Sequence, residues 1–313
     1  MKMTYDDYQD SAPICGINTT YNANRSCSLV FKATEDMLPP VLVYYELTNF
    51  HQNHRNYFQS RDDFQLLGKV GEQTSIQKEL CNPLNQMGNM TLNPCGLIAN
   101  TFFNDYFTLT EGRDSTGKRL EMIEKGIAWS SDIEYMYKQP DGFNFSECPV
   151  DQCDATCCEG TDSSCVTPYY DVAADKCYKY FYPLDDETRY LHETYPDIIS
   201  PIEGVTNEHF IVWMRVATQP TFQKLYGWIN QPISKGERLT FQVNANYVVT
   251  RFRGTKSLII TTNNIFGGRN PYFGPSFYYL GYFCFAAGAF FTLKHLFRPR
   301  KLADPAYLQY KED

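Results

Sequence analysis

The chain has 313 residues, of which 43% are hydrophobic, so it is long and apolar enough to bury the core of one large domain or two smaller ones. Its 28 basic and 36 acidic residues give a net charge of -8, which argues against non-specific binding to nucleic acid or anionic lipid because both reward clustered Lys and Arg. Wholesale disorder and nucleic-acid binding are therefore excluded at the outset.

Cysteines and glycosylation sequons indicate an oxidising compartment. Cys284 lies inside a membrane-like segment, and ten cysteines precede it: Cys15, Cys27, Cys81, Cys95, Cys148, Cys153, Cys157, Cys158, Cys165 and Cys177. The same region holds four sequons for N-linked glycans, at Asn18, Asn24, Asn89 and Asn144. Ten cysteines can pair completely, so we expect residues 1–273 to form a disulfide-bonded, glycosylated ectodomain in the lumen or outside the cell.

The amino terminus, MKMTYDDYQDSAPICG, lacks the apolar segment of a secretory signal or a membrane span. Disulfides and glycans nevertheless require the ectodomain to cross a membrane. We therefore expect a first transmembrane span to be missing from this sequence.

The first predicted strand covers Val41 to Leu47, because this segment is rich in β-branched and aromatic residues. A polar stretch follows, in which His51 and His54 precede Asp62 and Asp63. One interpretation of these residues is a metal or acid–base site, and the other is an ordinary polar surface. We favour the polar surface.

Residues 148–177 are a Cys-rich insert with six cysteines in a Gly-, Asp- and Ser-rich stretch that has too few apolar residues for a core of its own. Disulfides would supply the constraint, and the spacing does not choose among the possible pairings. Paired C-x-x-C motifs and a nearby His are both lacking, so a zinc site is disfavoured. The acidic run Asp185, Asp186 and Glu187 without EF-hand spacing indicates a solvated loop rather than a calcium site.

A second strand is predicted over Phe210 to Ala217, ending before Pro220, and a short amphipathic segment is predicted to follow it. Core packing is the favoured interpretation of the aromatic side chains here. A partner-facing patch is the alternative, because aromatic and Arg residues dominate interface anchors. The candidates for partner contact are Trp213, Arg215, Tyr226 and Trp228.

Between Leu239 and Val249 apolar and polar residues alternate, which predicts a half-buried strand. Ser257 to Thr262 predicts a further strand, and Asn263 to Gly268 a turn. Together these elements predict a mainly β fold with α extensions (α+β), built on an antiparallel sheet with long disulfide-bonded loops.

Residues Gly274 to Phe297 are predicted to form a transmembrane helix, because their uncharged stretch has the roughly 20 residues needed to cross a bilayer. A buried core helix is the alternative. Lys294, Arg298 and Arg300 follow this stretch, so the positive-inside rule places residues 298–313 in the cytosol and residues 1–273 outside.

The familiar catalytic motifs are absent from the sequence: it contains no G-x-S-x-G, G-x-G-x-x-G, P-loop or H-E-x-x-H. We therefore expect neither an enzyme nor a bound cofactor or metal.

Five ordered segments resemble the accessory, or β, subunits of type-four P-type ATPases, the phospholipid flippases. They are YYELTNFHQNHRNYFQSRDD (Tyr44 to Asp63), NPCGLIANTFFND (Asn93 to Asp105), KGIAWSSD (Lys125 to Asp132), HFIVWMRVATQPTFQKLYGWI (His209 to Ile229) and FRGTKSLIITTNNIFGGRNPYFG before the predicted span. The missing first span and the rich Cys148 to Cys177 insert depart from that family's pattern.

The resemblance implies a non-catalytic subunit with two spans, whose ectodomain sits on the lumenal loops of the ATPase in a heterodimer. It also implies a chaperone-like role in export from the endoplasmic reticulum and in the transport cycle. The protein would then reside in the endoplasmic reticulum, the Golgi and endosomes, or the plasma membrane. Carried over by position, Cys15 pairs with Cys27 and Cys81 with Cys95.

A cell-surface receptor or adhesion glycoprotein is the alternative function, and a hydrolase using His51 or His54 is the least favoured.

Overall fold

A computed structural model of the protein describes residues 1–10, 13–17, 25–70, 79–114, 116–149, 153, 168–172, 174–184, 186–264, 267–268 and 272–298. The chain divides into two compact units, residues 1–262 and residues 263–313. Each unit is described by itself.

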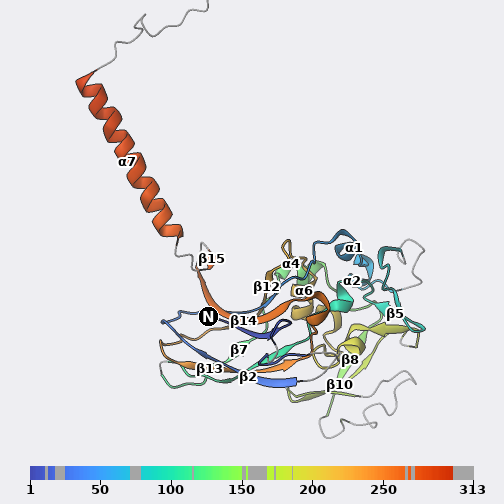
Figure 1. The fold of residues 1–313 in the computed structure, drawn as a ribbon. Helices are drawn as coiled ribbons and strands as arrows, with labels where there is room; N and C mark the ends of the chain where they lie inside the picture. Colours follow the sequence, from blue (N-terminus) through green and yellow to red (C-terminus); the bar gives the residue numbers. More distant parts are fainter. Residues whose placement is uncertain are drawn as a thin grey trace, which may run out of the picture. The chain divides into compact units, whose positions relative to one another are not determined.

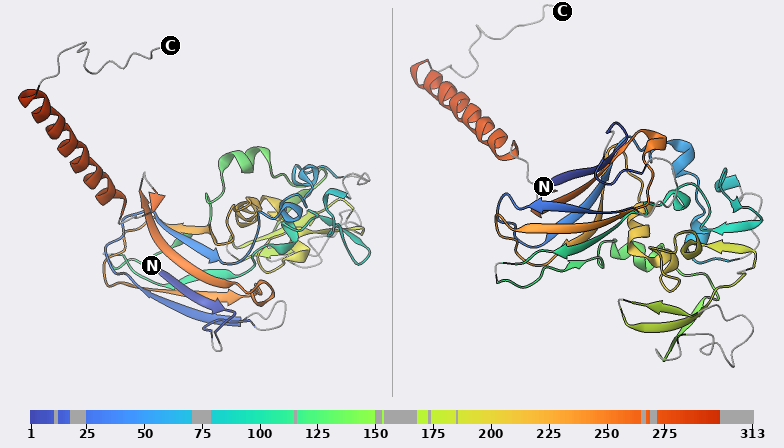
Figure 2. Two further views of the ribbon diagram at one scale, coloured as in Figure 1. Left: turned by 45° about the horizontal axis from the view of Figure 1, so that its top comes forward. Right: turned by 60° about the horizontal axis from the view of Figure 1, so that its bottom comes forward.

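The larger unit is built on two antiparallel sheets. The first sheet has the order β1 (Lys2–Asp7), β14 (Thr255–Asn264), β3 (Val41–Leu47), β12 (Phe222–Ile229) and β7 (Met122–Ile123), and β15 (Gly267–Gly268) pairs with the end of β14 (Figure 1). The second sheet has the order β2 (Arg25–Lys32), β13 (Arg238–Ala245) and β6 (Tyr106–Glu111). Figure 2 shows these two sheets lying face to face, which makes a β-sandwich.

Two smaller sheets and several short helices are added to the sandwich. One sheet joins β4 (Gln86–Met87), β5 (Met90–Asn93) and β11 (Thr188–Tyr190), and its β5–β11 pair is parallel. The other joins β8 (Asn144–Cys148), β10 (Lys176–Phe181) and β9 (Tyr169–Asp171). The short helices are α1 (Arg55–Phe58), α2 (Asp63–Leu66), η1 (Ala99–Thr101), α4 (Ser130–Tyr135), α5 (Leu191–Thr194), η4 (Gly204–Thr206), α6 (Glu208–Met214) and η5 (Thr250–Phe252). The predicted mainly β fold with helical additions is confirmed.

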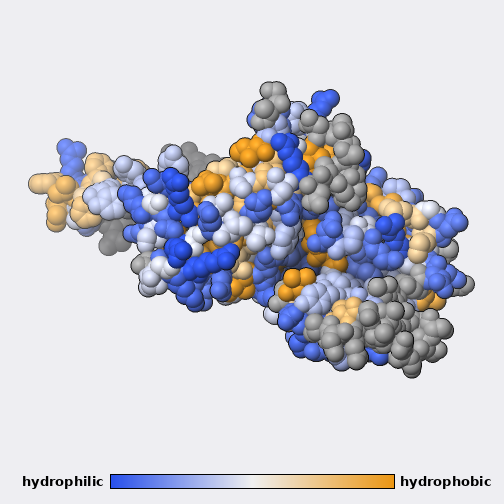
Figure 3. Space-filling view, turned by 90° about the horizontal axis from the view of Figure 1, so that it is seen from below, coloured by the Kyte–Doolittle hydropathy of each residue, from blue (hydrophilic) through white to orange (hydrophobic). Residues whose placement is uncertain are grey.

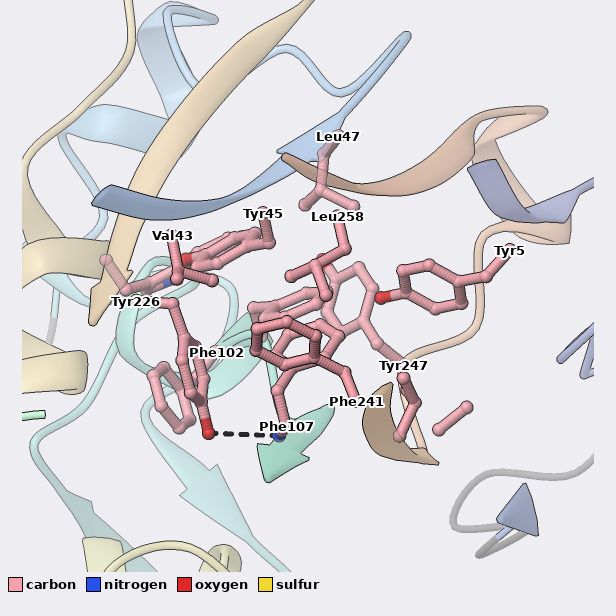
Figure 4. Packing of buried hydrophobic residues seen from close by; sticks show 14 of the residues in the cluster. Tyr5, Val43, Tyr45, Leu47, Phe102, Phe107, Tyr226, Phe241, Tyr247 and Leu258 are labelled. Atoms are coloured by element: carbon pink, nitrogen blue, oxygen red, sulfur yellow. Dashed lines mark hydrogen bonds between the residues drawn. The ribbon is translucent and has the colours of Figure 1, made fainter. Parts of the chain in front are cut away.

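Aromatic rings fill the space between the two larger sheets (Figure 4). The Phe107 ring of β6 lies 5.9 Å from Tyr5 of β1 and 4.8 Å from Tyr226 of β12, measured between ring centroids and in edge-to-face geometry. The Tyr226 hydroxyl also accepts a hydrogen bond from the Phe107 backbone N–H at 3.2 Å. Such rings contribute both apolar area and oriented contacts, so they hold the two sheets in one packing arrangement.

A buried ionic cluster crosses the same interface. The Lys256 Nζ of β14 lies 2.8 Å from the Asp105 carboxylate and 3.3 Å from the Asp6 carboxylate, and it donates to the Tyr247 carbonyl at 2.7 Å. The Tyr5 hydroxyl donates to Asp105 at 2.7 Å. Burial raises the pKa of Asp6, while the charge of Lys256 opposes that rise. The cluster ties β1, β14 and the start of β6 together.

Three of the predicted strands are confirmed. β3 spans the predicted range, and β14 contains the predicted segment from Ser257 to Thr262. In β13 the side chains of Leu239, Phe241, Val243 and Ala245 are fully buried and alternate with partly exposed polar residues. The strand ends at Ala245, four residues earlier than predicted. In the predicted turn from Asn263 to Gly268, Asn263 and Asn264 belong to β14 and pair with Gly268 and Gly267 of β15, and residues 265–266 lie outside the described residues.

The predicted strand from Phe210 to Ala217 is wrong, because its residues up to Met214 belong to helix α6 and the remaining three form no strand. The Asn207 side chain accepts a hydrogen bond from the Phe210 N–H at 3.2 Å and so caps the amino end of the helix. At the other end the buried Lys224 Nζ donates to the carbonyls of Val212, at 3.1 Å, and Arg215. The amphipathic segment predicted to follow Pro220 is strand β12.

The smaller unit contains α7 (Phe273–Phe297), a helix of 25 residues. Its composition and length are sufficient to cross a membrane, and its side chains are exposed to their surroundings. The predicted span from Gly274 to Phe297 falls within this helix. Within the smaller unit none of its side chains is buried.

Hydrophilic residues dominate the face of the protein in Figure 3, where hydrophobic residues form separate small patches. Several large apolar side chains of the larger unit are exposed, among them Trp129 and Tyr135.

Candidate partner-contact surface

Two of the four predicted partner-contact residues are buried, which corrects their assignment. Trp213 of α6 is 0% exposed, and its indole N–H donates to the Ile98 carbonyl at 2.8 Å. Tyr226 is 4% exposed and packs in the sandwich core. Both side chains therefore stabilise the fold rather than reach a partner.

Arg215 lies at the surface beside an exposed tryptophan. Its guanidinium makes two hydrogen bonds to the Asp132 carboxylate, at 2.6 and 2.9 Å. The guanidinium carbon lies 4.2 Å from the centroid of the Trp129 ring, in cation–π geometry. These contacts fix the orientation of both Arg215 and Trp129.

The fourth candidate, Trp228, is half-buried on β12. Its indole N–H donates to the Lys125 carbonyl at 2.9 Å. Trp228 therefore anchors the loop that leads into α4, and we retain it with Arg215 as a candidate near the contact surface.

The α4 segment, defined as residues Glu124 to Met136, is held to the larger unit at several points. The Glu208 carboxylate accepts the backbone N–H groups of Gly126, Ile127 and Ala128 at 2.8 to 3.0 Å. The His209 Nε2 lies 2.9 Å from the Glu124 carboxylate. A carboxylate that accepts several backbone N–H groups restrains the loop strongly, so the α4 segment is fixed in place.

The α4 segment nevertheless exposes large apolar side chains. Trp129 is 65% exposed, Tyr135 64% and Met136 46%. A groove of about 340 Å³ lies beside them. It is lined by Asp132, whose carboxylate binds Arg215, and by Phe58, Arg61, Met136, Tyr137, Met214, Arg215 and Val216. Sequence reasoning missed Trp129, Tyr135 and Arg61. The available signal was that Arg61 and Trp129 lie in two of the segments that carry the family resemblance, Tyr44 to Asp63 and Lys125 to Asp132.

The structure contains the two disulfides that the resemblance implied. Cys15 is joined to Cys27, with their Cα atoms 5.9 Å apart, and Cys81 is joined to Cys95, with their Cα atoms 5.6 Å apart.

In the Cys-rich insert, Cys153 is joined to Cys177 and Cys148 is also disulfide-bonded. The predicted disulfide cysteines Cys157, Cys158 and Cys165 lie outside the described residues.

Two predicted glycosylation sites can be placed in the structure. Asn89 is exposed in the turn between β4 and β5, and Asn144 is exposed at the start of β8. Asn18 and Asn24 lie outside the described residues.

Among the residues that the structure describes, the alternative sites weighed in the sequence do not assemble into a centre. His51 and His54 are exposed, and the Asp62 carboxylate caps helix α2 by accepting the Phe64 N–H at 2.8 Å. Asp185 lies outside the described residues, while Asp186 and Glu187 are exposed. In the part of the chain that the structure describes, no group of three or more His, Cys, Asp or Glu side chains is arranged to hold a metal ion.

Comparison with known proteins places these features in a family. Residues 1–301 match the profile of the LEM3 (ligand-effect modulator 3) family / CDC50 family. The chain is 32% identical over 293 residues to "ALA-interacting subunit 3" of Arabidopsis thaliana, covering 93% of this chain and 70% of that protein. It is 31% identical over 304 residues to "Cell cycle control protein 50A" of Bos taurus, covering 93% and 75%.

A third relative is "Phospholipid-transporting ATPase accessory subunit CDC50" of Chaetomium thermophilum, which is 30% identical over 302 residues, covering 93% of this chain and 66% of that protein. The similarity thus extends through the β-sandwich, the disulfide-bonded loops and helix α7. With nearly the whole chain matched in this way, the protein belongs to the LEM3/CDC50 family.

Proposed function

We propose that this protein is the non-catalytic accessory subunit of a type-four P-type ATPase that translocates phospholipids, and that the two form a heterodimer. The observation that carries the proposal is family membership over residues 1–301, because relatives in that match are named accessory subunits of phospholipid-transporting ATPases. The described residues add support, since they form a β-sandwich and a membrane-length helix.

In this proposal the ATPase supplies the chemistry and the lipid pathway, while this chain stabilises it. The disulfides and the buried Lys256 cluster make the larger unit rigid. A rigid unit loses little conformational entropy when it binds, so it can hold flexible loops of a partner in one arrangement. Such support would serve both export of the ATPase from the endoplasmic reticulum and its transport cycle.

The proposed topology places residues 1–273 in the lumen or outside the cell, residues 274–297 across the membrane and residues 298–313 in the cytosol. Support comes from the basic residues that follow the uncharged part of α7, beginning with Lys294. The disulfides support the same side for the larger unit, because they persist in oxidising compartments. The complex would reside in the endoplasmic reticulum, the Golgi and endosomes, or the plasma membrane.

Affinity purification of the full-length protein from gently solubilised membranes, followed by mass spectrometry, tests the proposal. We expect a P-type ATPase to co-elute in about equal amount. Cells that lack this protein should retain that ATPase in the endoplasmic reticulum. Recovery of the protein alone or with a soluble ligand, together with normal ATPase export in its absence, would favour a receptor or adhesion glycoprotein instead.

A further inference from the structure

We propose that the first sugar of an N-linked glycan on Asn144 packs against the exposed ring of Phe181. The glycan then covers the outer face of the small sheet β8–β10–β9, defined as the face that carries Asn144, Ser146, Lys179 and Phe181. The inference rests on the topology proposed above, which places the Asn144 sequon where N-glycans are added. It does not depend on the ATPase partner.

The first argument is the strand register. Asn144 of β8 and Phe181 of β10 lie directly opposite one another in an antiparallel pair (Figure 1). Directly opposite residues place their side chains on the same face of a sheet, with Cβ atoms about 4.5 to 5.5 Å apart. Both residues are exposed. A sugar joined to the Asn144 amide nitrogen therefore begins within one side-chain length of the Phe181 ring.

The second argument is that the Phe181 ring stands apart from the other aromatic rings of the sheet. Its chain neighbours Tyr180 and Tyr182 point to the opposite face, where their ring centroids lie 6.1 Å apart. On that face Phe145 also contacts Tyr178, at 5.9 Å. Phe181 is 37% exposed, and among the described residues no aromatic ring packs against it. One face of its ring is thus open to a covering group.

The chemistry of the sugar fits an aromatic surface of this kind. N-acetylglucosamine presents C–H bonds on the faces of its ring, and their slight positive charge complements the negative face of an aromatic ring. In the attachment step the Asn144 Nδ2 loses a proton and bonds to C1 of the sugar, and the lipid-linked pyrophosphate on that carbon leaves. Ser146 supplies the hydroxyl that the sequon requires. The occupant of the surface is therefore part of the modified chain itself.

The third argument is that β10 is held in place on both sides of Phe181. Cys177 is joined to Cys153 by a disulfide at one end of the strand. Tyr182, directly after Phe181, is 2% exposed, and its hydroxyl donates to the Pro201 carbonyl at 2.7 Å. The Phe181 ring therefore has a fixed position before the sugar reaches it, which lowers the entropy cost of the contact.

The position of the sequon gives the contact a consequence. In the described structure β8 is an edge strand, with β10 as its neighbour, and Asn144 is its first residue. An exposed strand edge beside an exposed aromatic ring is a site for unwanted pairing with other chains. A glycan seated on Phe181 would lie along this edge and keep it from pairing.

A double-mutant cycle on the full-length protein tests the contact. Asn144→Gln removes the glycan, Phe181→Ser removes the ring, and the two changes are made singly and together. Asn144→Gln should lower the melting temperature by about 2 °C when Phe181 is present and should have no effect when Phe181 is replaced. Enzymatic trimming of the glycans to one N-acetylglucosamine should leave the melting temperature unchanged, because the contact involves the first sugar.

Two further variants separate the sugar contact from ordinary packing. Phe181→Tyr keeps the ring and should preserve the effect of Asn144→Gln. Tyr170→Ser is the matched control, because Tyr170 is a 41% exposed aromatic residue on the far strand β9, opposite Cys177. Asn144→Gln should lower the melting temperature in the Tyr170→Ser background as it does in the wild type.

Mass spectrometry of the glycopeptides decides whether the sugar is there to make the contact. An unmodified Asn144 in a protein that carries a glycan at Asn89 overturns the inference and leaves the topology standing, whereas unmodified sequons at both positions overturn the topology as well. With Asn144 glycosylated, an equal effect of Asn144→Gln with and without Phe181 overturns the inference. Recovery of the ATPase tests the proposed function separately.

Discussion

At the scale of single residues, Lys256 is a fully buried cation whose charge is balanced by buried carboxylates. It is 0% exposed and contacts two carboxylates, those of Asp6 and Asp105. Replacing Lys256 with Met should lower the free energy of unfolding by about 3 to 5 kcal/mol, because two buried carboxylates lose their cation. Denaturant titration of the purified protein measures this change. Lys235→Met, at an exposed lysine, is the control, and an equal small loss in both variants would contradict the argument.

His192 makes the larger unit sensitive to acid. Burial lowers its pKa from 6.5 to about 4, its side chain lies among Tyr180, Tyr182 and Tyr190, and within the described structure its Nδ1 has no hydrogen-bond partner. The unfolded chain therefore binds more protons between pH 6.5 and pH 4, so this histidine lowers stability progressively as the pH falls through that window.

The substitution His192→Phe should remove this penalty. We expect the variant to be close to wild type at pH 7 and more stable than wild type by about 2 kcal/mol at pH 5. Thermal unfolding at the two pH values measures the difference. His54→Phe, at an exposed histidine, is the matched control, and a shift of equal size at both pH values would show that packing rather than protonation is responsible.

At the scale of elements, helix α6 depends on contacts that a local pattern does not display. Phe210, Ile211 and Trp213 favour a strand by their residue types, but the Asn207 cap and burial of four side chains against the sandwich make the segment helical. Asn207→Ala should lower the free energy of unfolding by about 1 kcal/mol, whereas Asn207→Ser should retain most of it by keeping a cap oxygen. Equal losses in the two variants, measured by denaturant titration, would show that the cap is unimportant.

At the scale of the whole molecule, the proposed topology exposes sequons to the glycosylation machinery. Asn89 and Asn144 both lie at exposed turn or strand-end positions. The substitutions Asn89→Gln and Asn144→Gln should each increase gel mobility by one glycan, and enzymatic removal of N-glycans should bring both variants to the mobility of the deglycosylated wild type. Asn53→Gln, at an exposed asparagine outside any sequon, is the control. Unchanged mobility of all variants would place the larger unit on the cytosolic side.

The sequence by itself determined the features that depend on local pattern and composition. Three local patterns each predicted one element with bounds correct to within a few residues, because periodicity and length act locally. They are the alternation in β13, the β-branched run of β3 and the apolar length of α7. Five ordered segments indicated the family, which the comparison with known proteins confirms, whereas the oxidising compartment inferred from cysteine and sequon content stays a prediction.

Only the tertiary structure decided the features that depend on distant residues. Trp213 and Trp129 are the same residue type, yet one is fully buried and the other is 65% exposed. Burial is set by what packs against a side chain, and in α6 and the α4 segment those neighbours come from far along the chain. The groove with Arg61 and Arg215 arises in the same way, since its two guanidinium groups are 154 residues apart in sequence (215 − 61) and become neighbours only after folding.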